Sequence, residues 1–385
     1  MRDSGVAMVG ETASNRRAPN GVAAPPPQEG AAEQADKEVM CVPRLRPSPN
    51  AEHVPERYDE VEQLEYPAAM YSIMEQYLPS NLLKAPREKK IEILERICAK
   101  YRPNGDRTRR HRVYRERIRL TYKPLHEELS ALNPEQFFVQ SFRNAIDDGS
   151  AEAFRKIMKY QSSGLFAFDM FEPRFCSLIM DEVEHFENWA QEAKFKVMRP
   201  NTMNNYGAVL DDIGMEEMLD QLMREYITPM SSVLFPNVGG ASLDSHHGFV
   251  VEYSMDRDLE LGFHVDDSEV TLNVCLGKDF GGGQLFFRGV RCEMHVNGEA
   301  RSDEVLDYSH VPGRAILHAG RHRHGAKEIT SGQRTNLILW CRSSEFRELT
   351  KYQRDFSSWC GECLTWKKER RRKLSNVKPQ PASAV

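Results

Sequence analysis

The chain has 385 residues, of which 40% are hydrophobic and 28% are charged, and its formal net charge is −5. This composition is typical of a soluble globular protein with one substantial domain, and a mildly acidic chain has no overall attraction to nucleic acid or membranes. No apolar run reaches membrane-spanning length, and the first residues lack the hydrophobic stretch of a secretory signal peptide. These features argue against a membrane-spanning protein and predict an intracellular one, in the cytoplasm or the nucleus.

The N-terminal part of the chain divides into two regions of different composition. Residues 1–56 are rich in Ala, Pro, Gly and Glu and contain too few large apolar side chains to offset the entropy of ordering, so we predict a disordered arm. Residues 57–163 change to helical text such as PREKKIEILERICAKY, in which apolar residues recur at helical spacing after Pro86. We predict a helical, basic region that packs on the rest of the chain or binds a partner.

Eight arginines lie close together in residues 102–119. A dense basic stretch of this kind can contact nucleic acid or an acidic partner. It can also form a solvated helix face that balances the acidic remainder of the chain. The sequence leaves both interpretations open for the arginines, which are Arg102, Arg107, Arg109, Arg110, Arg112, Arg115, Arg117 and Arg119.

A strand followed by a helix marks the start of the predicted catalytic domain, which we place at residues 164–345. The run LFAFD is typical of a short strand, and Pro173 suits the first turn of the helix that follows. Large apolar side chains recur along one face of this helix, which predicts that it packs on the domain core. They are Phe175, Leu178, Ile179, Val183 and Phe186.

Short β-branched and aromatic runs dominate the predicted core of the domain, residues 245–343. They are FVVEY, EVTLNVCL, GQLFFRG, RAILHAG and TNLILWC, and polar or Gly-rich segments separate them. Several short strands of this kind predict a β-barrel or β-sandwich flanked by helices. Gly281, Gly282 and Gly283 precede a strand and lack the Lys-Ser/Thr of a phosphate loop, so we interpret them as a tight turn.

The last segment, residues 346–385, is a basic tail that contains the pair Cys360 and Cys363. The eight cysteines of the chain are too sparse and irregular for a disulfide framework, and no second Cys-x-x-Cys pair is present to complete a four-sulfur zinc site. The pair could be a redox dithiol or half of a shared metal site. We favour an ordinary reduced tail that ends in a disordered stretch rich in Pro, Ala and Ser.

His264 and Asp266 alternate in the sequence GFHVDDSEVTLNV, immediately before a predicted strand. Alternate side chains of an extended chain point the same way, so both can reach one metal ion. A histidine and a carboxylate are two of the three ligands in the facial triad of iron(II) oxygenases. His185 and Glu187 have the same spacing but lie in the predicted helix, where residues two apart diverge, and we assign them to the surface.

Three histidines downstream are candidates for the third metal ligand: His318, His322 and His324. A second constraint is needed to choose between them. An enzyme that binds 2-oxoglutarate must hold its far carboxylate, and a planar guanidinium suits a bidentate contact. Arg334 begins the last predicted strand and is the candidate for this contact.

The motif H-x(7)-G-x-R, formed here by His324, Gly332 and Arg334, resembles the distal-histidine and cosubstrate-arginine pattern of the lysyl hydroxylase branch of the 2-oxoglutarate oxygenases. Together HVD, TLNVCLGKDFGGGQLFF and HGAKEITSGQR resemble the prolyl and lysyl hydroxylase-type Fe(II)/2-oxoglutarate dioxygenase domain over about residues 165–343. The segments RPNTMNNYGAVL, LDSHHGFVVEYS and DLELGFHVDD resemble one branch of that family still more closely. This resemblance selects His324 as the third metal ligand.

The resemblance implies an α+β fold whose centre is a double-stranded β-helix, or jelly-roll, flanked by helices. It also implies an oxidoreductase that uses Fe(II), O2 and 2-oxoglutarate, with ascorbate as a supporting reductant, and that hydroxylates a protein side chain while 2-oxoglutarate becomes succinate. Around the metal, strand alternation assigns Thr271 and Asn273 to the cosubstrate pocket, and Asn336 shares a face with Arg334. The family pattern adds Tyr253 as a cosubstrate contact, although a partly buried core tyrosine is an equal alternative.

Other functions stay open at this point. The arginine-rich stretch is compatible with an oxygenase that acts on nucleic acid, since the iron chemistry would be the same. A catalytically silent scaffold and a zinc hydrolase with the same three ligands are further alternatives. The Asn-rich loop RPNTMNNYG either binds substrate or is only a hydrogen-bonded turn segment.

Overall fold

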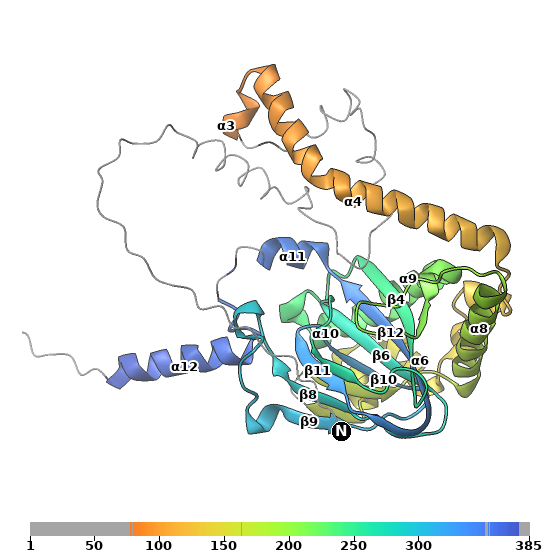
Figure 1. Cartoon of the computed structure of the whole chain (residues 1–385). Coiled ribbons are helices and arrows are strands. Elements are labelled where there is room, and N and C mark those ends of the chain that lie inside the picture. The colour runs from red at the N-terminus through yellow and green to blue at the C-terminus, as the bar shows by residue number, and fades with distance from the viewer. Residues whose placement is uncertain (1–77, 79, 163, 351–352, 354, 377–385) are drawn as a thin grey trace, which may run out of the picture.

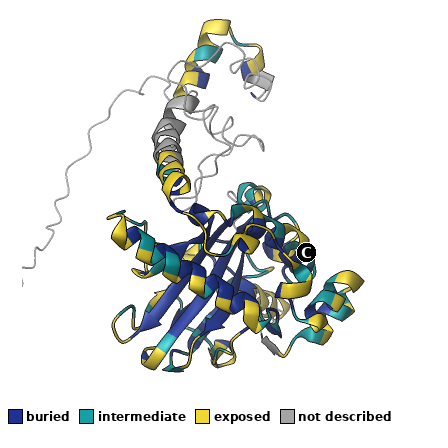
Figure 2. Cartoon of the chain, turned by 90° about the vertical axis from the view of Figure 1, so that its right-hand side faces the viewer, coloured by how far each residue is buried: buried dark blue, intermediate teal, exposed yellow. Residues whose placement is uncertain are grey.

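The computed structural model describes residues 78, 80–162, 164–350, 353 and 355–376 (Figure 1). The arm predicted for residues 1–56 and the Pro/Ala/Ser-rich end of the chain lie outside these described residues. Between them, two antiparallel sheets face each other and helices cover the larger one, which is the α+β jelly-roll arrangement that was predicted. Figure 2 shows that the strands are mostly buried, whereas much of the described helical surface is exposed.

The larger sheet has the strand order β1-β2-β10-β6-β12-β4-β3, and β7 pairs with β12 beside this path. The smaller sheet has the order β5-β11-β8-β9, which leaves β5 at an edge. The strands of the larger sheet are β1 (Tyr160–Ser162), β2 (Leu165–Asp169), β3 (Gly207–Val209), β4 (Ser245–Ser254), β6 (Val270–Gly277), β7 (Phe280–Gly282), β10 (Arg314–Ala319) and β12 (Ile329–Arg342). Those of the smaller sheet are β5 (Leu261–His264), β8 (Leu285–Val290), β9 (Val305–Tyr308) and β11 (His322–Ala326).

Helices precede the barrel, cover its larger sheet and follow it. The first group consists of α3 (Ser80–Leu83), α4 (Arg87–Thr121), η2 (Glu127–Ser130), α5 (Pro134–Phe137), α6 (Gln140–Asp148) and α7 (Ala151–Ile157). The covering helices are α8 (Pro173–Glu192), η3 (Leu210–Ile213), α9 (Glu216–Gln221), the π-helical turn η4 (Leu222–Ile227), α10 (Thr228–Leu234) and η5 (Pro236–Val238). The smaller turns η6 (Glu293–His295) and η7 (Ser302–Glu304) and the helices α11 (Ser344–Thr350) and α12 (Gly361–Asn376) complete the described chain.

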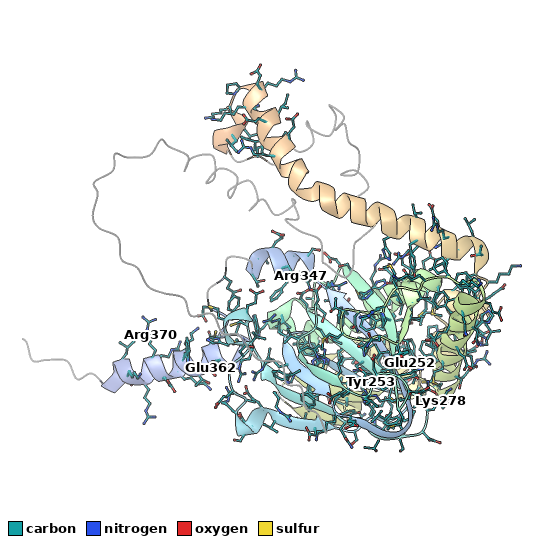
Figure 3. All side chains as sticks on the ribbon, in the orientation of Figure 1. Glu252, Tyr253, Lys278, Arg347, Glu362 and Arg370 are labelled. Carbon is teal, nitrogen blue, oxygen red and sulfur yellow. The ribbon has the colours of Figure 1, made fainter. Side chains whose placement is uncertain are left out.

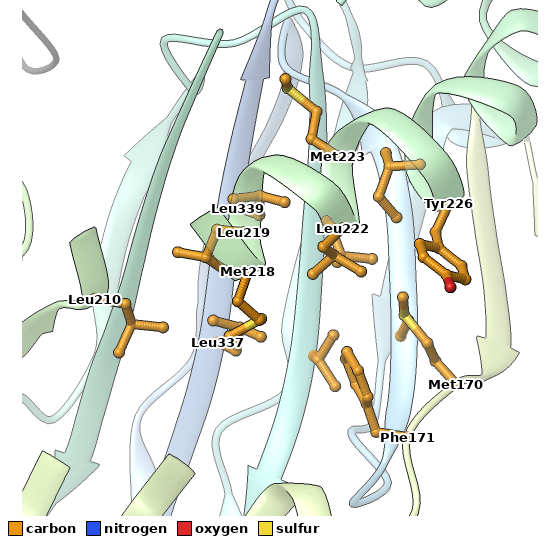
Figure 4. Packing of buried hydrophobic residues seen from close by; sticks show 14 of the residues in the cluster. Met170, Phe171, Leu210, Met218, Leu219, Leu222, Met223, Tyr226, Leu337 and Leu339 are labelled. Atoms are coloured by element: carbon orange, nitrogen blue, oxygen red, sulfur yellow. The ribbon is translucent and has the colours of Figure 1, made fainter. Parts of the chain in front are cut away.

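The main hydrophobic core lies between the covering helices and the outer face of the larger sheet. Figure 4 shows Met218, Leu219 and Leu222 of α9 and η4 packed over Leu337 and Leu339 of β12. Helix α8 begins at Pro173, and the five apolar residues of this helix that were predicted to face the core are all buried. The predicted packing face of this helix is therefore confirmed.

Strand β6 shows why the pocket is polar on one side of the sheet and the core apolar on the other. Val270, Leu272, Val274 and Leu276 belong to the core under the helices. The alternate residues, among them Thr271, point into the space between the two sheets. Alternate side chains of β6 thus face the apolar core on one side and the polar pocket on the other.

The arginine-rich stretch lies in α4. The arginines near its C-terminal end form ion pairs with acidic residues of the same chain. The buried Arg115 places its Nε 2.8 Å from Asp212 Oδ1 and its Nη1 3.3 Å from Glu216 Oε2. Arg119 also reaches Glu216, at 3.5 Å. These two side chains hold α4 against the helices on the barrel, which is a structural use that the sequence did not distinguish from nucleic-acid binding.

Among the described residues, no helix combines the length and the apolar character needed to cross a membrane. Helix α4 has 35 residues, but charged side chains are distributed along it.

His246 is a buried histidine in the same acidic region, and it gives a pH test of this packing. Its Nε2 lies 3.0 Å from Asp211 Oδ1, and Asp220 is also within ion-pair distance. Burial alone would lower the pKa of His246, but Asp211 and then Asp220 and Glu216 raise it above its ordinary value. The positive charge therefore stabilises the folded state, and this contribution is present in full below the unfolded pKa of about 6.5 and lost as pH rises through the higher folded pKa.

We expect the difference in unfolding free energy between the wild type and His246→Gln to be largest below about pH 6 and to shrink at higher pH. Denaturant titrations of both proteins at several pH values measure this difference. Subtracting the variant's unfolding free energy from that of the wild type removes the contributions of other titrating groups. A difference that stays constant from acid to alkaline pH would show that folding does not raise the pKa of His246.

Candidate metal centre and cosubstrate pocket

His264, Asp266 and His324 meet at one end of the barrel, and one donor atom of each lies within 4.8 Å of the others. Asp266 Oδ1 lies 3.4 Å from His264 Nε2 and 3.7 Å from His324 Nε2. The two histidines are direct cross-strand partners in β5 and β11, which brings residues 60 positions apart in the sequence side by side. The structure therefore brings together the three residues predicted to bind the metal.

Hydrogen bonds set the tautomer of both histidines. The Nδ1 atom of His264 lies 2.8 Å from the carbonyl oxygen of Gly262, and that of His324 lies 2.8 Å from the carbonyl oxygen of His322. A carbonyl only accepts, so each Nδ1 carries a proton, and the atom of each ring that faces Asp266 is Nε2. Imidazoles oriented in this way by backbone carbonyls are typical of metal ligands.

Asp266 is held as a carboxylate by its surroundings. Thr271 donates a hydrogen bond of 2.6 Å to Asp266 Oδ2, and Ser268 contacts the Thr271 hydroxyl in turn. Burial by itself would raise the pKa of Asp266, but His324 and His264 lower it well below its ordinary range. The donor set consists of two imidazole nitrogens and one carboxylate oxygen, which fits iron(II).

The two other candidate histidines occupy different places. His318 lies beneath the three, fully buried, with its Nε2 3.8 Å from Asp266 Oδ2. His322 packs its ring against Phe287, with the ring centroids 4.9 Å apart. Neither belongs to the group of three converging donors, so the choice of His324 from the family motif agrees with the geometry.

A pocket extends from these three residues between the two sheets. It is lined from the larger sheet by β4, β6 and β12 and from the smaller sheet by β5, β8 and β11. Every residue that the sequence assigned to the cosubstrate pocket lines it. These are Tyr253, Thr271, Asn273, Arg334 and Asn336.

Arg334 is a buried cation at the far side of the pocket. Its guanidinium stacks over the Tyr253 ring, 4.2 Å from the ring centroid, and its Nη1 donates to the carbonyl oxygen of Gly283. Its Nε has no hydrogen-bond partner, and no carboxylate of the described residues forms an ion pair with it. A buried guanidinium without an acid is costly, so this pocket is suited to an anionic ligand.

Two glycines allow close backbone packing around Arg334. Gly283 has φ +66°, and a Cβ there would lie 2.9 Å from Arg334 Nη1. Gly332 has φ +71°, and a Cβ there would lie 2.0 Å from the carbonyl oxygen of Asp279. The glycine of the H-x(7)-G-x-R motif therefore lets β12 pass close to the segment before β7. The interpretation of residues 281–283 as a tight turn is wrong for Gly281 and Gly282, which belong to β7 and pair with β12.

The sequence analysis considered Asn204 only as a member of the Asn-rich loop, and it did not identify His310 as a site residue. Asn204 donates a hydrogen bond of 3.1 Å to the Tyr253 hydroxyl and lines the pocket, so one part of the Asn-rich loop faces the site. Both Asn204 and its neighbour Asn205 donate to Asp258, as turn residues would, but only Asn204 also reaches Tyr253. His310 lies within 3.5 Å of Asn336, but a single histidine in a loop carries no signal for such a place.

A second group of donors lies away from the pocket and corrects one sequence prediction. Cys360 and Cys363 do not form an isolated pair, because Cys292 and His295 from the segment after β8 approach them within 4.8 Å. The second half of this group is Cys-x-x-His rather than Cys-x-x-Cys, which is why a search for a second cysteine pair did not find it. Of the interpretations of the pair, the structure therefore favours part of a metal site over an ordinary reduced tail.

A jelly-roll with a two-histidine, one-carboxylate group beside a buried arginine is the arrangement of Fe(II)- and 2-oxoglutarate-dependent dioxygenases. A family model described as the OGFOD2-like domain matches residues 118–240. The chain is 54% identical over 338 residues to the 2-oxoglutarate and iron-dependent oxygenase domain-containing protein CP2 of Arabidopsis thaliana, which covers 87% of this chain and 86% of that protein. It therefore belongs to the family of 2-oxoglutarate and iron-dependent oxygenase domain-containing proteins, which are oxidoreductases.

Two further relatives show how the similarity falls off. The 2-oxoglutarate and iron-dependent oxygenase domain-containing protein 2 of Xenopus tropicalis is 40% identical over 240 residues, 60% of this chain and 66% of that protein. This is the branch that the three additional segments of the sequence resembled. The multifunctional procollagen lysine hydroxylase and glycosyltransferase LH3 of Rattus norvegicus is 26% identical over 212 residues, 53% of this chain and 26% of that protein.

Proposed function

We propose that this protein hydroxylates a protein side chain, with iron(II) bound by His264, Asp266 and His324 and 2-oxoglutarate held by Arg334. The observation that carries the proposal is the buried Arg334, which has no acidic partner among the described residues and faces the same pocket as the three metal donors. The far carboxylate of 2-oxoglutarate would supply the missing acid. With iron and 2-oxoglutarate bound, such a centre couples oxidation of a substrate C–H bond to conversion of 2-oxoglutarate and O2 into succinate and carbon dioxide.

The residues around Arg334 fix its direction. Tyr253 stacks on the guanidinium, and Asn204 holds the Tyr253 hydroxyl. Asn336 Nδ2 donates to Asn273 Oδ1 at 2.7 Å, while Asn336 Oδ1 has no partner among the described residues. We therefore assign Tyr253 and Asn273 to orientation of the cosubstrate, and Asn336 to a direct contact with it.

A protein substrate is supported by the edge of the smaller sheet next to the metal donors. Strand β5 ends in His264 and, among the strands that the structure describes, pairs only with β11, so its other side is an edge next to a metal donor. Phe263 of β5 is 51% exposed, and Met203, whose side chain lies next to Gly262 of β5, is 41% exposed. An extended peptide can add to such an edge by main-chain hydrogen bonds and cover apolar side chains of this kind. The similarity to a procollagen lysine hydroxylase points the same way.

The substrate class is tested with the full chain, loaded anaerobically with Fe(II) and supplied with 2-oxoglutarate, O2 and ascorbate. Cell extract should stimulate succinate formation above the uncoupled rate, and the stimulation should survive nuclease treatment but not removal of protein. Mass spectrometry of extract proteins should then find peptides heavier by one oxygen atom with the wild type and not with Asp266→Ala. Stimulation that nuclease abolishes would replace the proposal with a nucleic-acid substrate, and absence of any turnover would favour a silent scaffold.

A further inference from the structure

Four potential metal ligands from two distant segments converge beside the smaller sheet. Cys292 and His295 follow β8, and His295 ends the turn η6. Cys360 immediately precedes α12, and Cys363 lies in its first turn. Cys292, His295 and Cys360 are buried and Cys363 is partly so, and none of the four lines the pocket described above.

Four of the six distances between the donor atoms match those of a tetrahedral site, and the other two are below 4.8 Å. His295 Nδ1 lies 3.3 Å from Cys292 Sγ, 3.6 Å from Cys360 Sγ and 3.4 Å from Cys363 Sγ, and the sulfurs of Cys292 and Cys363 are 3.8 Å apart. In a tetrahedron with Zn–S near 2.3 Å and Zn–N near 2.0 Å, the edges are about 3.5 Å between sulfur and nitrogen and about 3.8 Å between two sulfurs. One ion at the centre of the four atoms would meet all of them at bonding distance.

We propose that Cys292, His295, Cys360 and Cys363 bind one Zn²⁺ in a closed structural site that fixes the C-terminal helix on the barrel. Three soft sulfurs and one imidazole nitrogen in a tetrahedral arrangement select zinc, and four protein ligands leave no open position for a reaction. The two ligand pairs, Cys-x-x-His and Cys-x-x-Cys, have the spacing with which a short turn and a helix start chelate zinc.

The surroundings fit the charge of such a site. Three thiolates and Zn²⁺ carry a net charge of −1. Two arginines lie next to it together with Glu304, with which both form ion pairs, and these three side chains carry a net charge of +1. A Cβ on Gly361 would lie 2.9 Å from Arg291 Nη1 and 3.2 Å from Arg301 Nη1, which places both guanidinium groups at the start of α12. Arg301 donates to the carbonyl oxygen of Gly361 and to Thr365, and the ring of Trp366 meets that of His295 edge to face at 4.6 Å.

Helix α12 also needs such an anchor, because it buries almost nothing of its own. Figure 3 shows it leaving the barrel, with Glu362 near the barrel and Arg370 farther out. Its residues are exposed or only partly buried, and Cys360, just before it, is the buried residue at this junction. A short helix without an apolar face gains little from packing, so ligand bonds to the barrel explain why it lies where it does.

Metal analysis of the full chain tests the site without any assay of activity. After a mild chelator has stripped the iron centre, we expect one zinc per chain in the wild type and in His324→Ala, and none in Cys292→Ser or Cys363→Ser. The matched control is Cys176→Ala, a buried cysteine outside the cluster, which should keep its zinc. Zinc that depends on His324, or that stays in the cysteine variants, would overturn the proposal.

A second measurement covers variants that fail to fold. Wild-type chain reconstituted with cobalt(II) should show the thiolate charge-transfer absorption and the intense d–d bands of a tetrahedral cysteine site, and trypsin should cut the lysines and arginines of α12 faster after the metal is removed. A disulfide between two of the three cysteines in freshly purified, zinc-free protein would identify a redox site instead.

Discussion

Asp266→Ala should abolish the conversion of 2-oxoglutarate to succinate, and His324→Ala should do the same. Each substitution removes one of three converging donors, and two donors do not hold iron(II) against water and chelators. Loss of a residue that merely supports a metal ligand typically costs about 10–100-fold in affinity or activity, so loss of a ligand should exceed about 100-fold. Succinate formation and iron content after anaerobic loading are the two measurements.

His322→Ala is the matched control for His324→Ala. Both histidines lie on β11 and are buried, but His322 packs on Phe287, and only its backbone carbonyl contacts His324. The control should keep its iron and most of its turnover while losing some stability. His318→Ala should lose part of its iron and turnover, because His318 lies beside Asp266 and packs its ring against His324 but is not one of the three converging donors. Full iron content in His324→Ala together with loss in His318→Ala would exchange the roles of the two histidines.

The face of each strand could be predicted from the sequence because side chains alternate with a period of two. Once the strand EVTLNVCL was recognised, its apolar residues had to face the helices and Thr271 and Asn273 had to face the other way, as they do. The same rule placed Arg334 and Asn336 together on β12. The third metal donor needed more, since alternation alone allows His322 as well as His324, and the spacing of the family motif supplied the choice.

The remaining site residues could not be predicted, because the contacts that define them are distant in the sequence. Asn204 reaches Tyr253 across 49 positions, and Cys363 meets Cys292 across 71. No local pattern reports such a contact, and a Cys-x-x-His pair is common enough to carry little weight until a second pair lies beside it. The burial of Arg115 could not be predicted for the same reason, because its acidic partners lie about a hundred residues downstream.

Arg334→Ala should raise the KM for 2-oxoglutarate while leaving the iron content unchanged. A hydrogen bond to a charged group contributes about 1.5–3 kcal/mol, which corresponds to an increase of about 10-fold to 150-fold in KM. Arg334→Lys should recover only part of this, because an ammonium group keeps the charge but not the planar pair of donors or the stacking on Tyr253. Succinate formation measured against 2-oxoglutarate concentration gives both values.

Gly283→Ala extends the same test without touching the arginine. The added Cβ would press on Arg334 Nη1 in a backbone conformation that favours glycine, so the guanidinium must shift and the KM for 2-oxoglutarate should again rise. Arg288→Ala, which removes a partly buried arginine on β8 whose contacts are with Phe287, Leu306 and Asp307, should leave the KM unchanged. If Arg334→Ala had the same KM as the wild type, the anion in this pocket would be bound elsewhere, and the assignment of the cosubstrate site would fail even with the metal donors intact.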